Sequence, residues 1–201
     1  MRRTLTTLLG LSLLVSAVAL PATAENGTIA DIVIAASGGV DAIGSLDDNN
    51  MDYDILREAV LADETLTAAV SGTGDFAGVD LTVLAPNDSA FLRLTGASSE
   101  ADAVQWLVDN GLAPGSAALQ DVVLYHVVAG ASLSTQDVFF DGYDEVKKVK
   151  MANGQNLKVK FLQLKDRNGR LVGPRWRAMD IMADNGMIHT IKDVILPRTN
   201  A

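Results

Sequence analysis

The sequence predicts an α+β fold in which a helical first part is followed by a β-sheet. Apolar residues recur at helical spacing from residue 28 to about residue 126, whereas beyond residue 130 apolar and polar residues alternate as they do in strands. Three Asn-Gly pairs, at 153–154, 168–169 and 185–186, mark hairpin turns in this second part. The chain has 201 residues, 48% of them hydrophobic, and no Cys, which excludes a disordered chain and a disulfide scaffold.

The first 24 residues predict a secretory signal peptide. A charged start at Arg2–Arg3 precedes the apolar run Leu8–Leu20, and Ala22–Ala24 has the small-x-small pattern that a signal peptidase cleaves. The run of 13 residues is shorter than the roughly 20 that a membrane span needs. We therefore expect cleavage before Glu25, one domain over residues 25–201, no membrane span, and a secreted, periplasmic or cell-surface location.

Charge is divided unevenly along the chain. Residues 25–146 contain 21 acidic and two basic residues, whereas residues 147–201 contain 12 basic and four acidic residues. The net charge of −9 argues against general nucleic-acid binding, because duplex DNA repels so acidic a protein. Either the two halves face and neutralise each other, or the basic segment meets an anionic partner.

Residues with strong capping preference place the predicted helices. Thr28, with Asp31 three residues later, forms a capping-box pattern before an apolar stretch. After a strand predicted at 79–85, Asn87 or Asp88 is expected to accept N–H bonds at the start of the next helix. The predicted helices begin at or just after Thr28, Asp54, Asp63, Ser99 and Ser116.

The turn at Asn153–Gly154 defines the first predicted hairpin. A two-residue loop there would mix apolar and charged side chains on each face. A three-residue loop that pairs Val149 with Val159, and Met151 with Leu157, keeps the apolar residues together. The sequence therefore predicts a bulged turn whose glycine is left-handed.

This register places four lysines on the outer face of the hairpin. Lys150 would lie opposite Lys158, and Lys148 opposite Lys160. Like charges that face each other across strands are unfavourable unless something offsets them. We expect this face to be exposed to solvent and to bind anionic partners weakly and in a salt-sensitive way.

Three ordered segments resemble the signature of fasciclin-like domains. They are Leu81-Thr-Val-Leu-Ala-Pro-Asn-Asp-Ser-Ala-Phe91, Leu124-Tyr-His-Val-Val-Ala-Gly130 and Asp184-Asn-Gly-Met-Ile-His-Thr-Ile-Lys-Asp-Val-Ile-Leu-Pro197. The resemblance spans residues 28–197. It implies a single domain with a fasciclin-like β-sheet wedge and helices packed alongside, in a family of extracellular adhesion modules.

The resemblance also implies two places for partner contacts. Asp180 and Ile181 are similar to an Asp-Ile motif that is linked to integrin binding in animal members of the family. Adhesion has also been attributed to the segment that corresponds to Tyr125 and His126. The alternative is structural: Ile181 would belong to the core and Asp180 to a turn, and the apolar neighbours of Tyr125 and His126 favour burial.

No motif of catalysis or metal binding stands out. His126 and His189 are the only histidines; they lack a third ligand at motif spacing, and no Gly-x-Ser-x-Gly elbow supplies a nucleophile. Each lies in an apolar run, so we interpret both as core histidines. The stretch Asp48–Asp52 begins like a calcium loop, but Tyr53 and Ala59 stand where glycine and glutamate are required. We expect no metal, no cofactor and no enzyme activity.

These observations predict an adhesion or interaction module that binds a cell-surface or matrix protein or polysaccharide. The alternative is a carrier of a small ligand or polysaccharide, without catalysis. A hydrolase that uses His126 is a third and weaker hypothesis. A deep apolar pocket with converging polar groups would favour the carrier, and a shallow surface patch would favour adhesion.

Overall fold

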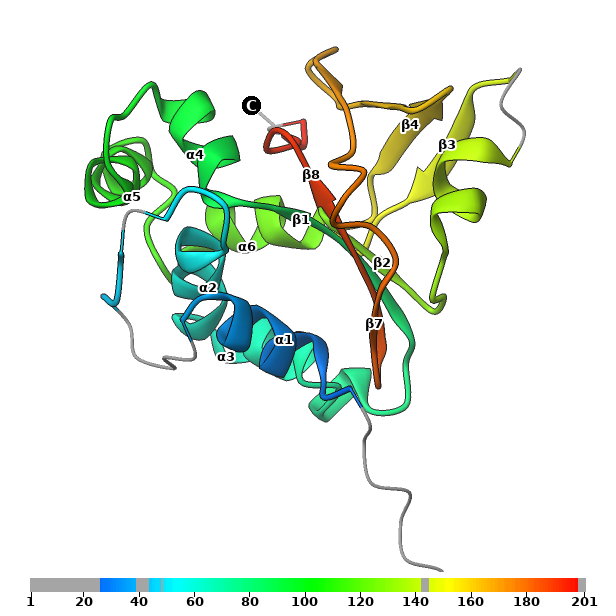
Figure 1. Ribbon diagram of the computed structural model, residues 1–201, viewed down its shortest axis with the longest axis horizontal. Coiled ribbons are helices and arrows are strands. Elements are labelled where there is room, and N and C mark those ends of the chain that lie inside the picture. The colour runs from blue at the N-terminus through cyan, green and yellow to red at the C-terminus, as the bar shows by residue number, and fades with distance from the viewer. Residues whose placement is uncertain (1–25, 39–43, 48, 142–144, 199–201) are drawn as a thin grey trace, which may run out of the picture.

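The computed structural model describes residues 26–38, 44–47, 49–141 and 145–198. The expected signal peptide, residues 1–24, lies outside the described residues. Within them, no helix combines the length and the apolar character needed to cross a membrane. The predicted α+β class is confirmed, because helices lie on one side of a central sheet and a second sheet lies on its other side (Figure 1).

Six α-helices of seven to ten residues occupy the described part of the chain. Their bounds are α1 Ile29–Ala36, α2 Asp54–Leu61, α3 Glu64–Val70, α4 Asp88–Thr95, α5 Glu100–Asp109 and α6 Ala117–Leu124. A 3₁₀ turn at Gly74–Phe76 leads into the first strand, and a π-helical turn at Gln136–Phe140 leads toward the second sheet. The alternation seen beyond residue 130 did not predict this last turn.

Eight strands form two four-stranded sheets. Their bounds are β1 Leu81–Pro86, β2 Val127–Ala129, β3 Lys147–Lys150, β4 Asn156–Lys160, β5 Gln163–Lys165, β6 Leu171–Val172, β7 Ile181–Ala183 and β8 Gly186–Ile191. The central sheet has the order β2-β1-β8-β7, and β1 runs parallel to β8. The other sheet is an antiparallel meander in the order β3-β4-β5-β6.

The three family-like segments meet in the central sheet. β1, β2 and β8 come from these segments and lie next to one another, although they are far apart in the sequence (Figure 1). Every residue of β1 is buried, as expected for a strand covered on both faces. The sequence signature is therefore the signature of the central sheet.

The central sheet separates two hydrophobic cores. Successive side chains of β1 point to opposite faces, so Val83 packs among the helices and Leu84 packs on the meander side. Leu157 and Leu164, from β4 and β5, fill the second core. The meander therefore has one buried face and one face left to solvent.

The capping predictions are confirmed for four helices. The hydroxyls of Thr28, Ser99 and Ser116 and the carboxylate of Asp63 accept N–H bonds from the first turns of α1, α5, α6 and α3. Thr28 and Asp31 form the full capping box.

The capping predictions for Asp54 and for Asn87 or Asp88 are wrong, since Asn87 stands at the cap position of α4 without a side-chain cap bond. α2 begins at Asp54, so Tyr53 and not Asp54 stands at the cap position, and Tyr53 makes no side-chain cap bond. Instead the two carboxyl oxygens of Asp88 accept the N–H groups of Asp54 and Ile55, both at 2.9 Å. Asp88 therefore caps α2 from the start of α4 rather than capping its own helix, a pairing that sequence spacing does not reveal.

The first hairpin has the expected loop but a different register. Met151 N–H donates to Gln155 O at 2.9 Å, which closes a three-residue loop, Ala152–Gly154. The left-handed glycine is confirmed, since Gly154 has φ 83°. Because Met151 faces Gln155 and not Leu157, each residue of β3 pairs with a residue of β4 that lies two positions earlier than expected.

Val149 pairs with Leu157 and not with Val159. Lys148 pairs with Lys158, and Lys150 pairs with Asn156. A displacement by two residues keeps each side chain on its face, so the predicted separation of lysines from apolar residues is retained.

Asn185 and Gly186 join the central sheet to the helices. Asn185 Oδ1 accepts the N–H of Ile29, and its Nδ2 donates to Val70 O, each at 2.9 Å. Gly186 follows with φ 151°, and a Cβ at this position would lie 2.0 Å from the carbonyl oxygen of Leu81. The Asn-Gly pair is therefore needed for close packing as well as for the turn.

Candidate functional site

The outer face of the meander carries a group of exposed lysines. Lys148, Lys158 and Lys165 form one row across β3, β4 and β5, because Lys158 pairs with both of the others. We call the lysine face the exposed set Lys148, Lys150, Lys158, Lys160 and Lys165. Within the described residues, no carboxylate lies within 4.0 Å of any of these amines.

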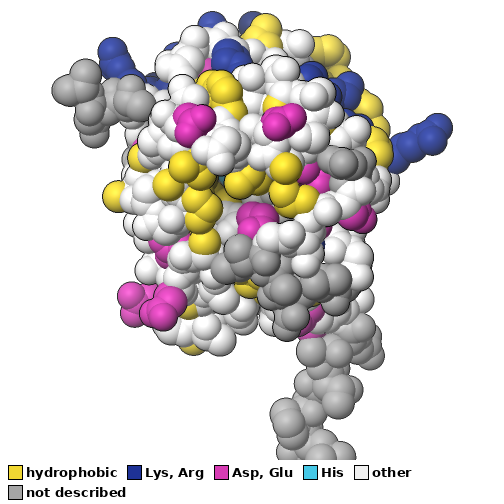
Figure 2. Space-filling view, turned by 90° about the vertical axis from the view of Figure 1, so that its left-hand side faces the viewer, with side chains coloured by type: hydrophobic (Ala, Val, Ile, Leu, Met, Phe, Trp, Pro, Cys, Tyr) yellow, Lys and Arg dark blue, Asp and Glu magenta, His cyan; other side chains and the backbone are white. Residues whose placement is uncertain are grey.

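The lysine face does not neutralise the acidic helices. In the part of the chain that the structure describes, two ion pairs of lysine or arginine join the two halves, Arg93 with Asp193 at 2.8 Å and Lys147 with Asp141 at 3.6 Å. Lys147 points away from the lysine face, and the pair Arg93 with Asp193 joins a cation of the acidic half to an anion of the basic half. Figure 2 shows the helical end of the molecule, where acidic side chains are spread over the middle and basic ones lie toward the edges. Charge is thus separated in space as well as in sequence.

An open groove of about 800 Å³ adjoins the lysine face. We call it the aromatic groove. Its lining residues are Val146, Lys158, Lys160, Phe161, Leu162, Gln163, Lys165, Leu171, Gly173, Pro174, Trp176 and Lys192. Trp176, Phe161 and Leu171 are 49%, 53% and 59% exposed. Four ammonium groups therefore surround a set of exposed apolar side chains.

Hydrogen bonds and ring contacts hold Trp176 in place. Arg175 N–H donates to Thr190 O, Ala178 N–H donates to Arg175 O, and Thr190 N–H donates to Ala178 O, each at 2.8 Å. The residues around Trp176 thus form a tight turn fastened to β8. The indole also contacts Phe139 edge-on, with ring centroids 6.1 Å apart, and Phe140 at 6.2 Å.

The turn between β4 and β5 holds Phe161 at the groove. Lys160 pairs with Gln163, which leaves Phe161 and Leu162 as a two-residue loop with φ of 35° and 62°. Such loops favour Asn and Gly, since positive φ costs roughly 1–2 kcal/mol for residues with a larger side chain. Strain of this kind is often found where a side chain serves a function.

Tyr125 and His126 are buried, which favours their structural interpretation. The hydroxyl of Tyr125 donates to Asn156 O at 3.3 Å, and burial raises the pKa of Tyr125 to about 12. His126 is 3% exposed, and both of its ring nitrogens are bonded. Ile195 N–H donates to Nε2 at 3.1 Å, so Nδ1 carries the proton and donates to Val122 O at 2.8 Å. Burial lowers the pKa of His126 to about 4, and the imidazole is neutral.

His189, Asp180 and Ile181 lie at the β7 edge of the central sheet. Asp180 N–H donates to His189 Nδ1 at 3.2 Å, and Nε2 of the buried ring donates to Leu133 O at 2.7 Å. Burial lowers the pKa of His189. The carboxylate of Asp180 is exposed but accepts Thr135 N–H at 2.6 Å, while Ile181 packs against the helical core. Partial burial of Asp180 acts to raise the pKa of its carboxyl group, but the hydrogen bonds from Thr135 outweigh this effect, so the pKa of Asp180 is lowered.

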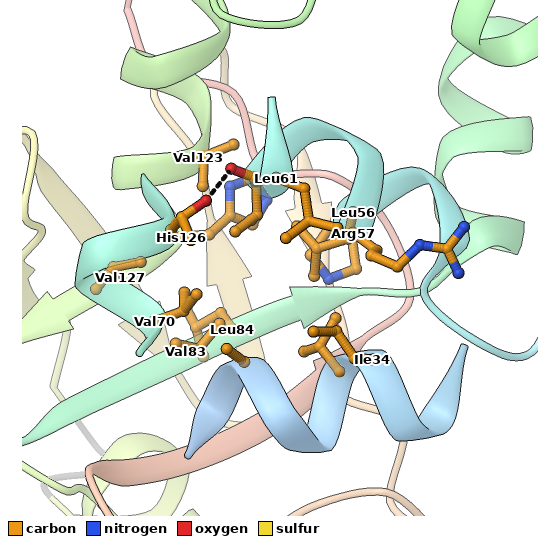
Figure 3. Close-up of a pocket in the computed structure, with 15 residues that line it drawn as sticks. Ile34, Leu56, Arg57, Leu61, Val70, Val83, Leu84, Val123, His126 and Val127 are labelled. Atoms are coloured by element: carbon orange, nitrogen blue, oxygen red, sulfur yellow. Dashed lines mark hydrogen bonds between the residues drawn. The ribbon is translucent and has the colours of Figure 1, made fainter. Parts of the chain in front are cut away.

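The apolar cavity among the helices is too small for a ligand. It lies between α1, α2, α3, α6 and β1, and its volume is about 30 Å³ (Figure 3). Sites for small ligands usually measure about 300–1,000 Å³. In Figure 3 the guanidinium of Arg57 points away from the cavity, so no charged group converges on it.

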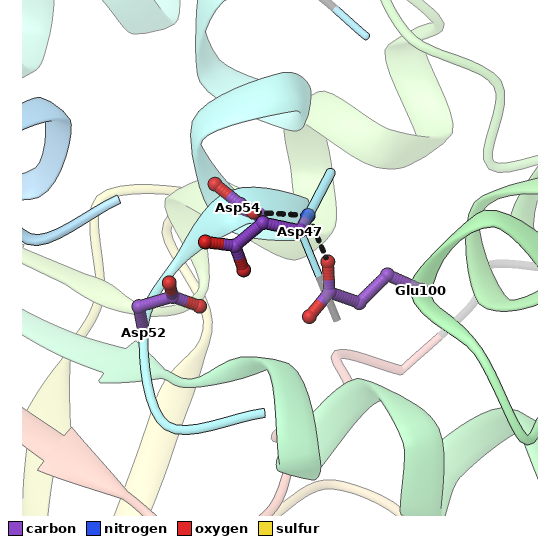
Figure 4. A group of neighbouring side chains, drawn as sticks. All are labelled: Asp47, Asp52, Asp54 and Glu100. Carbon is purple, nitrogen blue, oxygen red and sulfur yellow. Dashed lines mark hydrogen bonds between the residues drawn. The ribbon is translucent and has the colours of Figure 1, made fainter. Parts of the chain in front are cut away.

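Four carboxylates that sequence spacing did not connect converge beside α2. Asp47, Asp52, Asp54 and Glu100 each place an oxygen within 4.8 Å of the others (Figure 4). Asp47 N–H donates to Asp54 Oδ2 at 3.1 Å and to Glu100 Oε2 at 3.2 Å, and the Arg57 guanidinium binds Asp54. Oxygen ligands of this kind suit a hard cation.

Asp88 lies beside this acidic cluster. Burial, followed by a hydrogen bond with Asp52, raises the pKa of the Asp88 carboxyl to about 9. The folded protein therefore offsets part of the buried negative charge with a proton on Asp88, in addition to the charge of Arg57. The sequence pattern around Asp52 resembled an incomplete calcium loop. It did not indicate Asp88 or Glu100, because these residues belong to helices that come later in the chain.

The sequence also missed the aromatic groove. Alternation in β4 pointed to Lys158 and Lys160, but Lys192 and Trp176 come from loops whose positions depend on the central sheet. The side chains of Trp176 and Phe161 lie in separate turns, and no spacing in the sequence connects them. Only the three-dimensional arrangement brings these residues to one surface.

Comparison with known proteins agrees with the motif pattern. A family model described as the fasciclin domain matches residues 52–197. Curated protein sequences show no significant match. Among solved structures, the chain is similar to a FAS1 domain pair from the insect cell adhesion molecule fasciclin I, with 13% identity and a TM-score of 0.36; the alignment covers 58% of this chain and 36% of that chain. Because the family model matches well over half of its residues, the chain belongs to the fasciclin-domain family.

Proposed function

We propose that this protein is a secreted or periplasmic adhesion module that attaches to an anionic cell-surface or matrix polysaccharide through its lysine face. Fasciclin domains are generally adhesion modules without catalytic activity, at extracellular or cell-surface locations. The signal-peptide pattern of residues 1–24 supports the same location.

The single observation that carries the proposal is the uncompensated row of lysines. Lys148, Lys158 and Lys165 are neighbours across three strands, and such like-charged neighbours destabilise a sheet. No described carboxylate lies close enough to offset them. A polymer that carries regularly spaced anions would remove this repulsion on binding.

The structure offers less support for a small-ligand carrier. The apolar cavity of about 30 Å³ holds little more than one water molecule. The larger hollow is the aromatic groove, which is open and lies at the surface. A surface groove suits a polymer that passes across it, since both ends of the polymer can leave the site.

The proposal can be tested by binding of polygalacturonate to the purified protein. We expect weak binding that falls steeply between low salt and about 150 mM salt, where exposed charges are screened beyond about 8 Å. The triple variant Lys148→Gln, Lys158→Gln, Lys160→Gln should bind at least about tenfold more weakly, since a lysine near an anionic surface contributes about 1 kcal/mol.

A matched control removes the same charge elsewhere. Arg167, Arg177 and Arg198 are exposed and lie outside the lysine face. The triple variant Arg167→Gln, Arg177→Gln, Arg198→Gln should keep most of the affinity. Equal losses in the two triple variants would show that net charge alone matters and would contradict the assignment to the lysine face.

A further inference from the structure

The aromatic groove has features that attachment by charge alone does not require. It shares Lys158, Lys160 and Lys165 with the lysine face and adds Lys192, which directly follows β8. None of its twelve lining residues is acidic. The same hollow also exposes large apolar side chains, which a simple polyanion cannot use.

Exposed apolar side chains are concentrated at this place. Nine large hydrophobic side chains are exposed in the described part of the chain, and four of them line the groove: Val146, Phe161, Leu171 and Trp176. A fifth, Phe140, packs against Trp176. A cluster of this kind marks an interaction site more often than scattered exposure does.

Trp176 has the properties of a stacking platform. The flanking residues Arg175 and Ala178 are hydrogen-bonded to Thr190 of β8, and the indole ring contacts Phe139 and Phe140. About half of the side chain remains exposed. A rigid aromatic ring loses little conformational entropy on binding, and the negative face of its π-system attracts the slightly positive C–H groups of a sugar ring.

We propose that the aromatic groove is a saccharide-binding site that takes acidic sugar rings, of the hexuronate class. The indole of Trp176 stacks on the apolar face of one ring, and the ammonium groups of Lys158, Lys160, Lys165 and Lys192 pair with carboxylates of the same and neighbouring rings. The amide of Gln163 supplies a donor and an acceptor for ring hydroxyls. This inference rests on the proposed function and names the class of polymer that the lysine face binds.

The shape of the groove's basic surface favours a sugar polymer over a nucleic acid. All four of its cations are lysines, whose point charge can pair with a carboxylate or with a phosphate, so the distinction rests on the shape of the basic surface. Proteins that hold single-stranded nucleic acid stack successive bases along a continuous basic track. Here the basic groove is confined to one part of a protein whose net charge is −9.

The two tryptophans of the chain allow a direct test. Trp176 lies in the groove, and Trp106 lies on α5. In the variant Trp106→Phe, Trp176 is the remaining tryptophan, and its fluorescence should shift to shorter wavelength when oligogalacturonate is added. In the variant Trp176→Phe, the fluorescence of Trp106 should not change. A spectral shift of Trp106 in place of Trp176 would overturn the proposal.

Affinity separates this inference from the proposed function. Trp176→Ala should weaken binding of oligogalacturonate about tenfold or more, because a sugar ring loses its stacking partner. Polyglutamate has similar charges but no sugar rings to stack on Trp176. Its binding to Trp176→Ala should therefore stay within about twofold of its binding to the wild type. Thermal unfolding of each variant shows whether it is folded. If Trp176→Ala does not fold, the comparison is made with Trp176→Phe, which should retain part of the affinity for oligogalacturonate.

Each remaining outcome has a defined meaning. If oligogalacturonate and polyglutamate bind equally and Trp176→Ala affects neither, the saccharide site is wrong but attachment through the lysine face stands. If neither polymer binds, the proposed function itself fails. If an oligothymidylate of equal charge binds more tightly than oligogalacturonate, the groove recognises nucleic acid and the saccharide assignment is overturned.

Discussion

At the scale of single residues, the two histidines join segments that are distant in the sequence. The ring of His126 connects the end of α6 to Ile195 in the C-terminal segment. The ring of His189 connects β8 to Leu133 and Asp180. Both nitrogens of each ring are engaged, so neither histidine offers a free base for the hydrolase hypothesis.

His126→Ala should lower the free energy of unfolding by about 1–3 kcal/mol at neutral pH, the usual cost of a buried group without its partner. The effect should depend on pH. An unfolded histidine gains its proton near pH 6.5, but burial delays protonation of the folded one to about 4. The stability that neutral His126 provides is therefore present above pH 6.5 and is lost as the pH falls toward 4.

Urea unfolding of the wild type and of His126→Ala at several pH values would test this prediction. The difference between the two proteins should be largest above pH 6.5 and should shrink as the pH falls. A constant difference from pH 4 to pH 8 would show that His126 acts through packing alone.

Asp88 should give a pH dependence of opposite sign. Burial and the neighbouring Asp52 raise its pKa to about 9, so the folded protein holds a proton that the unfolded chain releases near pH 3.8. Stability that depends on this proton is present below pH 3.8 and is progressively lost as the pH rises toward 9.

The variant Asp88→Asn keeps a polar group at this position without the titration. We expect it to be less stable than the wild type at pH 5, because the amide cannot accept both N–H groups of α2. Its stability should fall less between pH 5 and pH 8.5, as measured by thermal unfolding. A slope equal to that of the wild type would show that Asp88 is ionised in the folded protein.

At the scale of elements, Gly186 lies where β8 is paired with Leu81 of β1 and leaves no room for a side chain. A Cβ there would lie 2.0 Å from Leu81 O, so the two strands must separate to accept any side chain. Gly186→Ala should therefore cost about 3 kcal/mol or more. Gly78→Ala is the matched control, because Gly78 also has positive φ (71°) but nothing lies within 4 Å of the added atom.

The control variant should lose only roughly 1 kcal/mol through its backbone conformation. Chemical denaturation of the two variants separates these contributions. Similar losses in Gly186→Ala and Gly78→Ala would mean that backbone conformation, and not contact with β1, makes Gly186 necessary.

Local elements could be predicted from the sequence, whereas contacts between them could not. Ser99, Ser116 and Asp63 cap helices within three residues of themselves, which is a pattern that spacing reveals. Asp88 caps a helix that precedes it by more than 30 residues, and spacing gave no sign of this. Four of the five lysines of the lysine face were predicted because strand alternation is local, but Lys165 was not among them. Trp176 reaches the groove only through the fold.

At the scale of the whole molecule, the separation of charge orients the protein. The lysine face and the aromatic groove lie on the meander, while acidic side chains are spread over the helical end (Figure 2). A polyanion would be repelled by the helices and attracted by the meander, which favours approach from one side.

Export should produce a protein that begins at Glu25. The apolar run Leu8–Leu20 followed by Ala22–Ala24 predicts cleavage after Ala24. Mass spectrometry of protein recovered from outside the cytoplasm should give the mass of residues 25–201. Recovery of exported protein that still carries residues 1–24 would contradict this prediction.

The parallel pairing of β1 with β8 has a consequence for the order in which the molecule can be assembled. Leu81 pairs with Gly186, and all of the residues between them must be synthesised before that pairing can form. Contacts between such distant segments form slowly, since a long loop must first be closed. A nascent chain that lacks β8 cannot complete its central sheet. This delay suits the proposed export, because a chain that stays unfolded until its last segment emerges can still be threaded through a narrow channel and can fold on the other side.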